Sequence, residues 1–175
     1  AARRSCCVRA AAGEYITANE DTAMSKPRVG LQLYSVREEC ARDLPGTLKA
    51  VAEMGYQGVE FAGHPGRTAS DLLRMLDNLG LDCCGSHIPL EALLGERFSD
   101  TVEFNQVLGN RYLVVPGLPP QYRASHAAWV ETAALFNDLC ERLAPHNLRI
   151  GYHNHTHEFQ PMEGEAPWDT FFVIR

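Results

Sequence analysis

The chain has 175 residues, 45% of them hydrophobic and 22% charged, a composition typical of a globular domain and not of a disordered or fibrous protein. Its formal net charge of -6 disfavours a nucleic-acid partner, because nucleic-acid-binding proteins concentrate Lys and Arg to neutralise phosphates. No run approaches the ~20 consecutive apolar residues that a membrane helix needs. The same acidic charge favours a small polar substrate. The six cysteines include no C-x-x-C pair, so we expect reduced thiols in a cytoplasmic protein.

The first 23 residues show neither strand alternation nor a helical stripe, and Met24 stands just ahead of a strand-like run. No sustained apolar stretch follows Arg3 and Arg4, so an export signal is not expected. We therefore expect residues 1–23 to be a disordered leader or an upstream extension, and residues 24–175 to form the folded domain.

From residue 29 onward, short apolar runs alternate with amphipathic segments. We predict strands over residues 29–34, 58–61, 82–87, 112–115 and 148–153. Helices are predicted between them, over residues 44–54, 68–79, 97–108 and 125–143. Asp43 and Ser125 are suitable N-caps, and Gly80 can adopt the left-handed conformation that ends a helix. This alternation of strands and helices predicts a parallel α/β sheet.

Such an alternation is compatible with an open doubly wound sheet and with a closed eight-stranded barrel, and periodicity alone does not distinguish them. Neither G-x-G-x-x-G nor G-x-x-x-x-G-K-[ST] follows any predicted strand. A nucleotide-binding open sheet is therefore disfavoured.

Polar side chains recur where the predicted strands end, and the active sites of parallel barrels are built at that edge. Gln32, Tyr34 and Arg37 surround the end of the first strand, Glu60 closes the second, and His87 closes the third. A single Glu or His at a strand end is usually structural. Their recurrence at equivalent strand ends favours a shared site.

The densest polar group lies in residues 151–159, at the end of the fifth predicted strand. If the strand continues through this run, His153, His155 and His157 lie on one side, and Glu158 needs a turn to join them. Imidazole and carboxylate suit divalent Zn, Mn, Co or Fe. A metal or catalytic role is therefore favoured over a surface histidine cluster.

Five motifs give the chain a family resemblance, and they lie at residues 29–37, 55–61, 85–87, 151–159 and 167–172. In this order and spacing, the chain resembles the sugar phosphate isomerase/epimerase group of xylose isomerase-like barrels over residues 26–172. The resemblance implies a parallel (β/α) TIM barrel of which about strands 1 to 5 of 8 are present, truncated at the C-terminus. By itself, such a chain is expected to bind metal weakly and to show no activity.

The resemblance also implies roles for individual residues around one divalent cation, which would be Mn, Zn, Co or Mg. We expect Glu60, His87 and His153 to be catalytic. Substrate contacts are expected from Gln32, Tyr34, Arg37 and Asn154. The metal ligands are expected to be Glu158 and His155, although many relatives place a carboxylate where this chain has His153, and spacing alone does not decide among the three.

The implied reaction is isomerisation or epimerisation of a sugar or sugar phosphate, through proton transfer next to the carbonyl and an enediolate. The nearest alternative is a lyase or dehydratase that shares the first step, such as an inosose dehydratase or an enzyme that cleaves 3-keto-glycosides. An endonuclease IV-like metal hydrolase and an inactive fragment are two further hypotheses. The expected partner is a sugar-like small molecule, with homo-oligomerisation possible and neither nucleic acid nor membrane expected.

Overall fold

The structure is a computed structural model that describes residues 27–63 and 66–173, so the predicted leader lies outside the described residues. Its five strands form one parallel sheet in the sequential order β1-β2-β3-β4-β5. The strands are β1 (Gly30–Gln32), β2 (Gly58–Phe61), β3 (Asp82–His87), β4 (Tyr112–Val115) and β5 (Arg149–Tyr152). The predicted parallel α/β sheet is confirmed.

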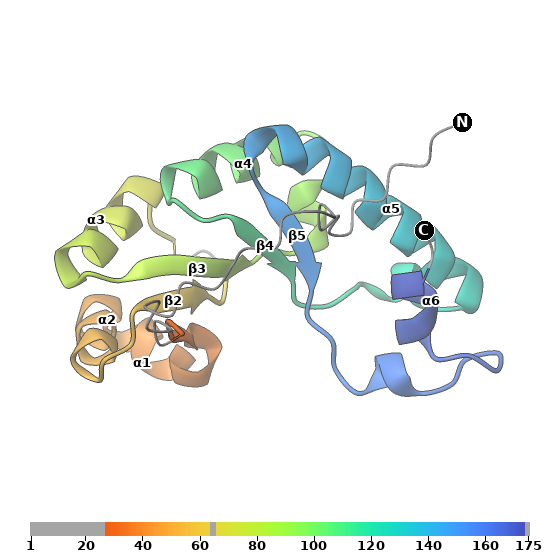
Figure 1. The fold of residues 1–175 in the computed structure, drawn as a ribbon, viewed down its shortest axis with the longest axis horizontal. Helices are drawn as coiled ribbons and strands as arrows, with labels where there is room; N and C mark the ends of the chain where they lie inside the picture. The colour runs from red at the N-terminus through yellow and green to blue at the C-terminus, as the bar shows by residue number, and fades with distance from the viewer. Residues whose placement is uncertain (1–26, 64–65, 174–175) are drawn as a thin grey trace, which may run out of the picture.

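Helices follow the strands and lie outside the sheet. They are α1 (Arg37–Arg42), α2 (Leu44–Glu53), α3 (Ala69–Leu79), α4 (Arg97–Val107), α5 (His126–Leu143) and α6 (Pro167–Val173). Figure 1 shows an arc of helices that runs from α2 through α3, α4 and α5 to α6, with the strands on its inner side. Sequential strand order with helices on the outside is the arrangement of a barrel segment.

The helix boundaries follow from local hydrogen bonds that the sequence predicts. Asp43 Oδ1 accepts from the Gly46 N–H (3.1 Å) at the start of α2, and Ser125 Oγ accepts from the Ala128 N–H (3.2 Å) at the start of α5. Gly80 ends α3 with a φ of 65°. This left-handed conformation costs glycine little free energy because glycine has no Cβ.

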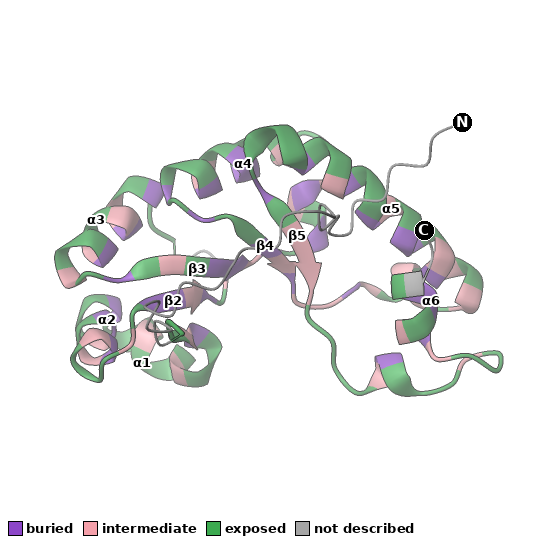
Figure 2. Ribbon diagram, in the orientation of Figure 1, coloured by how far each residue is buried: buried purple, intermediate pink, exposed green. Residues whose placement is uncertain are grey.

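The outer face of the sheet packs on the helices through two buried hydrophobic clusters. Val59 and Phe61 of β2 belong to the first cluster, with α2 and α3, and Leu113 and Val115 of β4 belong to the second, with α5. Figure 2 shows buried residues along the sides of the helices that face the strands. Alternate residues of these strands therefore point to the inner, concave face, where Glu60 lies between Val59 and Phe61.

Two predicted strands end earlier than the sequence indicates. The first stops at Gln32, because the Gln32 Oε1 atom accepts from the Tyr34 N–H (2.6 Å) and turns the chain into a 3₁₀ helix, η1 (Leu33–Val36). The fifth stops at Tyr152, and residues 157–159 form another 3₁₀ helix, η5 (His157–Phe159). A strand-like continuation through residues 153–157 is therefore wrong.

Candidate functional site

Glu60 and His87 form a close pair on the concave face. The two residues come from the ends of neighbouring strands, and their approach is fixed by the pairing of Glu60 with Gly85, two residues before His87. Glu60 Oε1 lies 3.0 Å from His87 Nε2, and the side chains are 26% and 12% exposed, respectively. The two strand ends thus hold a carboxylate and an imidazole together in a half-buried setting.

Gln32 contacts the other side of the same imidazole. Its Nε2 atom lies 3.4 Å from His87 Nδ1, while its Oε1 atom accepts from the Tyr34 N–H. The 3₁₀ turn after β1 therefore fixes the amide that faces His87. The structure brings Gln32, Glu60 and His87 into one contact group, as their positions at equivalent strand ends suggest.

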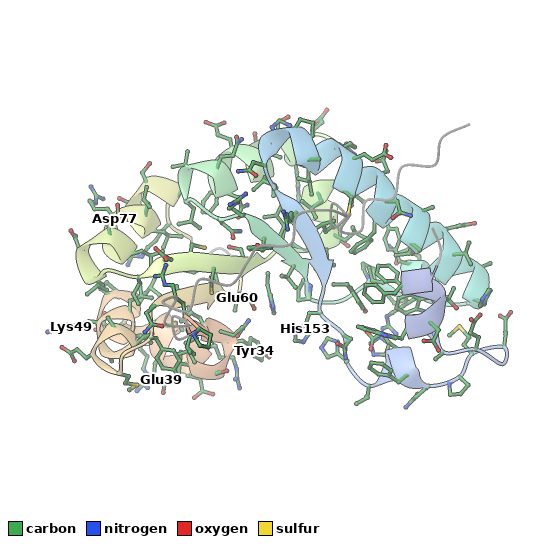
Figure 3. The ribbon with its side chains drawn as sticks, in the orientation of Figure 1. Tyr34, Glu39, Lys49, Glu60, Asp77 and His153 are labelled. Atoms are coloured by element: carbon green, nitrogen blue, oxygen red, sulfur yellow. The ribbon has the colours of Figure 1, made fainter. Side chains whose placement is uncertain are left out.

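His153 joins this group from the end of β5. Its backbone N–H donates to the Val115 carbonyl (3.0 Å), which continues the β4 ladder by one bond. Its ring lies edge-on to the His87 ring, with centroids 5.2 Å apart and an angle of 63° between the planes. Figure 3 shows Glu60 and His153 on the side of the sheet that faces away from α3, α4 and α5.

The surroundings of His87 keep its imidazole neutral. Burial lowers the pKa of His87, and the neighbouring His153 lowers it further, while the Glu60 carboxylate opposes both effects without reversing them. At neutral pH the His87 imidazole of this pair is therefore neutral.

A second group of candidate ligands follows β5. One ligand atom from each of His155, His157 and Glu158 lies within 4.8 Å of the others. Glu158 Oε1 is 3.1 Å from His157 Nε2 and 4.0 Å from His155 Nδ1. His157 was not among the ligands expected from the sequence, because the 3₁₀ turn that carries it beside Glu158 has no clear signal there.

Glu158 is fully buried and its carboxylate is held by the protein. Oε1 accepts from the Tyr152 hydroxyl (2.5 Å) and Oε2 accepts from the His155 N–H (2.8 Å). Burial raises the pKa of Glu158, but the hydrogen bonds from Tyr152 and from backbone N–H groups, together with His157, hold that pKa below its usual value. Glu158 is therefore ionised at neutral pH.

The Glu158 group fits a divalent cation. His157 Nε2 is buried and has no hydrogen-bond partner among the described residues, although a carboxylate oxygen lies beside it. Two imidazole nitrogens and one carboxylate oxygen form a donor set that Zn and other borderline cations accept. A cation bound by these three residues would satisfy the orphaned nitrogen.

The two groups are connected through their histidines. The ring centroids of His153 and His155 are 5.0 Å apart, and those of His155 and His157 are 5.8 Å apart. With the contact between His87 and His153, four imidazoles form a continuous row that has Glu60 at one end and Glu158 at the other.

The remaining predicted substrate contacts lie around this row without joining it. Tyr34 is 60% exposed, and the Arg37 guanidinium stacks on its ring at 4.6 Å from the centroid. Asn154 is exposed, and its side-chain amide donates to the His155 carbonyl (3.1 Å).

A cavity of about 540 Å³ opens beside the ends of β1 and β2. Its wall includes three arginines, Arg37, Arg42 and Arg67, but none of Glu60, His87 and His153. The cavity is therefore separate from the row of four imidazoles.

Comparison with known proteins gives the family. The model of the xylose isomerase-like TIM barrel family matches residues 48–171, which is most of the chain. A search of curated proteins finds no match. In the part of the chain that the structure describes, no helix is long and apolar enough to span a membrane.

Solved structures share the fold at low sequence identity. A sugar phosphate isomerase/epimerase from Parabacteroides distasonis superposes with a TM-score of 0.73 at 23% identity, over 87% of this chain and 66% of that one. An AP endonuclease, family 2, from Brucella melitensis gives 0.58 at 22% identity, over 73% and 55%. The IolI protein, solved with a zinc atom, gives 0.55 at 13% identity, over 72% and 51%. The chain thus spans between about half and two thirds of the length of these structures.

Proposed function

Because the chain belongs to the xylose isomerase-like TIM barrel family, we propose that it supplies the first five strands of a metal-dependent sugar isomerase or epimerase. The substrate class is a sugar or a sugar phosphate. The proposal concerns the whole barrel, since the chain spans only part of the length of the structures that share its fold.

The row of four imidazoles between two carboxylates carries this proposal. It places a neutral imidazole and a carboxylate in contact on the concave face, beside a second group whose donors suit a cation. Proton transfer next to a carbonyl needs both parts, a positioned base and a means of stabilising negative charge.

Glu60 is the proposed proton acceptor. Its carboxylate takes the proton from the carbon next to the substrate carbonyl, the electrons of that C–H bond form the C=C bond of an enediolate, and the π electrons of the carbonyl move onto its oxygen. Return of this proton to the neighbouring carbon, with transfer of the hydroxyl proton from one oxygen of the intermediate to the other, gives the isomer. Delivery of a different proton to the opposite face of the original carbon, by an acid on that side, gives the epimer while Glu60 keeps the proton it took. His153, at the same strand edge, is the proposed acid on that side.

The second group is the proposed metal centre. His155, His157 and Glu158 would hold a divalent cation, which supplies Lewis-acid stabilisation of negative charge on the substrate. Tyr152 and the His155 N–H fix the Glu158 carboxylate, so the protein orients this ligand before any metal binds.

Substrate contacts are proposed for residues at the rim of the site. Tyr34 and Asn154 offer exposed polar groups, and Arg37 lines the neighbouring cavity with Arg42 and Arg67. The wall of this cavity contains three arginines and one acidic residue, Asp43, and this excess of positive charge suits an anionic substituent such as a phosphate.

Exchange of substrate hydrogen with solvent tests the proposal. The whole protein is incubated in deuterated water with Mn²⁺ or Zn²⁺ and a panel of ketoses, aldoses and their phosphates, and deuterium in recovered sugar is measured by mass spectrometry. Glu60→Gln should lower the exchange rate ~10²-fold or more, because it removes the base. Glu103→Gln, an exposed change on α4, should leave the rate unchanged.

Three results would contradict the proposed reaction. Exchange that is undiminished in Glu60→Gln would remove Glu60 from the role of base. Metal-dependent cleavage of DNA containing abasic sites, without exchange into any sugar, would favour a nuclease. Exchange accompanied by loss of water would instead identify a dehydratase, which shares the first step.

A further inference from the structure

We propose that His87 is a positioning residue for Glu60 and not a proton acceptor, and that Gln32 sets the tautomer in which His87 does this. The inference deepens the proposed function, since it assumes that Glu60 is the base. It also changes two expected roles, because Gln32 was expected to contact substrate and His87 to be catalytic.

The orientation of the Gln32 amide is fixed by the backbone. Its Oε1 atom accepts from the Tyr34 N–H at 2.6 Å, and the opposite orientation would place the amide NH₂ against that N–H. The NH₂ group therefore faces His87 and acts as a donor toward Nδ1, 3.4 Å away.

The tautomer of His87 follows from both of its neighbours. A neutral imidazole has one protonated nitrogen, and Nδ1 must accept because it faces the Gln32 donor. The proton therefore lies on Nε2, 3.0 Å from Glu60 Oε1. In the other tautomer, two donors would meet at Nδ1 and a lone pair would face the carboxylate at Nε2, so the two contacts select the same form.

This arrangement leaves His87 no free nitrogen for a substrate proton. Nδ1 is occupied by Gln32, and Nε2 already carries a proton next to Glu60. The Nε2 atom is buried and its contact with Oε1 is close without being a well-aligned hydrogen bond, so His87 positions the carboxylate mainly by electrostatic attraction.

The second oxygen of Glu60 has room because of Gly85. An added Cβ at Gly85 would lie 2.8 Å from Glu60 Oε2 and 3.2 Å from its Cγ. The glycine thus admits the carboxylate in the orientation that places Oε1 beside His87. Gln32, His87, Glu60 and Gly85 act as one support for the base.

Nitrogen NMR of the full chain, labelled with ¹⁵N-histidine, reads the tautomer directly. We expect Nε2 of His87 to be protonated and Nδ1 to be unprotonated in the unmodified chain at neutral pH. Gln32→Glu should move the proton to Nδ1 or protonate both nitrogens, since it places an acceptor where the donor was. Gln106→Glu on α4 is the matched control and should leave the His87 signals in place. Protonation of Nδ1 in the unmodified chain, or a tautomer insensitive to Gln32→Glu, would overturn the proposal.

A rescue experiment in the whole protein separates positioning from proton transfer. His87→Gln keeps an N–H donor near Nε2 and should retain exchange within about tenfold of the unmodified protein, with an unchanged pH profile, while His87→Ala should lose ~10²-fold. Equal loss in both variants would overturn the positioning role. Should no sugar exchange at all, the proposed function fails, whereas the NMR result still decides the tautomer.

Discussion

At the scale of single residues, two glycines on the concave face should respond differently to the same substitution. Gly85→Ala places a methyl group 2.8 Å from Glu60 Oε2, whereas the nearest neighbour of a methyl group at Gly151 is Val114 Cγ2 at 4.0 Å. We expect Gly85→Ala to lower the free energy of unfolding by ~1–3 kcal/mol through overpacking, or to displace Glu60 with loss of activity. Gly151→Ala should do neither. Urea denaturation of the pair, with exchange activity alongside, tests this expectation.

The adjacent thiols Cys83 and Cys84 should differ in reactivity. Burial raises the pKa of Cys83 to about 11, and Cys84 is exposed although burial of part of its side chain also raises its pKa. At pH 8, only about one Cys83 in a thousand is then a thiolate, compared with roughly a quarter in an unfolded chain. Mass spectrometry of iodoacetamide-treated peptides should show Cys83 modified far more slowly than Cys84.

A rapid reaction at Cys83 would contradict its buried setting. The same experiment in 8 M urea is the control, since both thiols should then react at similar rates. Raising the pH of the folded chain toward 11 should accelerate the Cys83 reaction, because the thiolate fraction of Cys83 then rises toward one half.

The proximity of two side chains can be predicted from the sequence where the pairing of strands determines their positions. Glu60 and His87 each close a strand, and parallel neighbours bring such ends together, so their proximity could be anticipated. The contacts of Gln32 with His87 and of His157 with Glu158 depend on 3₁₀ turns. Side-chain direction in such short turns has no periodicity in the sequence from which it could be predicted.

At the scale of elements, a buried side-chain hydrogen bond ties the end of β5 to η5. The Tyr152 hydroxyl donates to the fully buried Glu158 carboxylate, while the Tyr152 ring packs against Trp129, Phe136 and Phe171. Tyr152→Phe keeps the ring contacts and removes the donor. We expect a loss of ~1–3 kcal/mol in the free energy of unfolding at pH 7, because a buried carboxylate loses one partner.

The pH dependence of this loss has a defined sign. The pKa of Glu158 in the folded chain is held below its unfolded value of about 4.3, so its contribution to stability is present above that pH and is lost as pH falls through the folded pKa. The difference between the unmodified chain and Tyr152→Phe should therefore hold from pH 7 down to about pH 5 and shrink only as the pH falls below about 4.3. Urea titrations across this range measure the difference, with the exposed Tyr112→Phe as control. A difference near zero at pH 7 would show that the bond is unimportant, and a non-zero difference that stays constant with pH would show that the ionised form of Glu158 is not what the bond stabilises.

The type of each element, helix or strand, could be predicted because it depends on local chemistry. The residues at which the first and fifth strands end could not be predicted. Caps such as Asp43 and the glycine turn at Gly80 lie at the helix boundaries where the sequence predicts them. The first strand ends early because a side chain, that of Gln32, takes the Tyr34 N–H. Hydrophobic alternation does not reveal this competition for a backbone donor.

At the scale of the whole molecule, the outer strands of the sheet should promote self-association. Within residues 27–63 and 66–173, β1 pairs only with β2, and β5 pairs only with β4. Strands with an unpaired edge tend to pair with another chain. We expect the weight-average sedimentation coefficient to rise with protein concentration, and a constant value for the monomer over a hundredfold range would contradict this expectation.

The barrel-type fold was predictable because strand order, crossover helices and strand-end chemistry all depend on the same repeated unit. The sequence could not predict that the polar strand ends form two groups joined by histidines. That arrangement depends on the turn after β5, which directs Glu158 toward Tyr152 in the buried layer and leaves His153 near His87 on the concave face.

Paramagnetic broadening by Mn²⁺ tests most directly whether the metal group and the proton-transfer group share this face. Histidine ring signals of the chain are followed by NMR during a titration with substoichiometric Mn²⁺. We expect that His155 and His157 broaden first, that His153 follows and His87 comes later, and that His126 and His146 remain sharp. Broadening that begins at His126, where Glu165 lies 3.3 Å away, or that is uniform over all described histidines, would contradict a metal centre at Glu158.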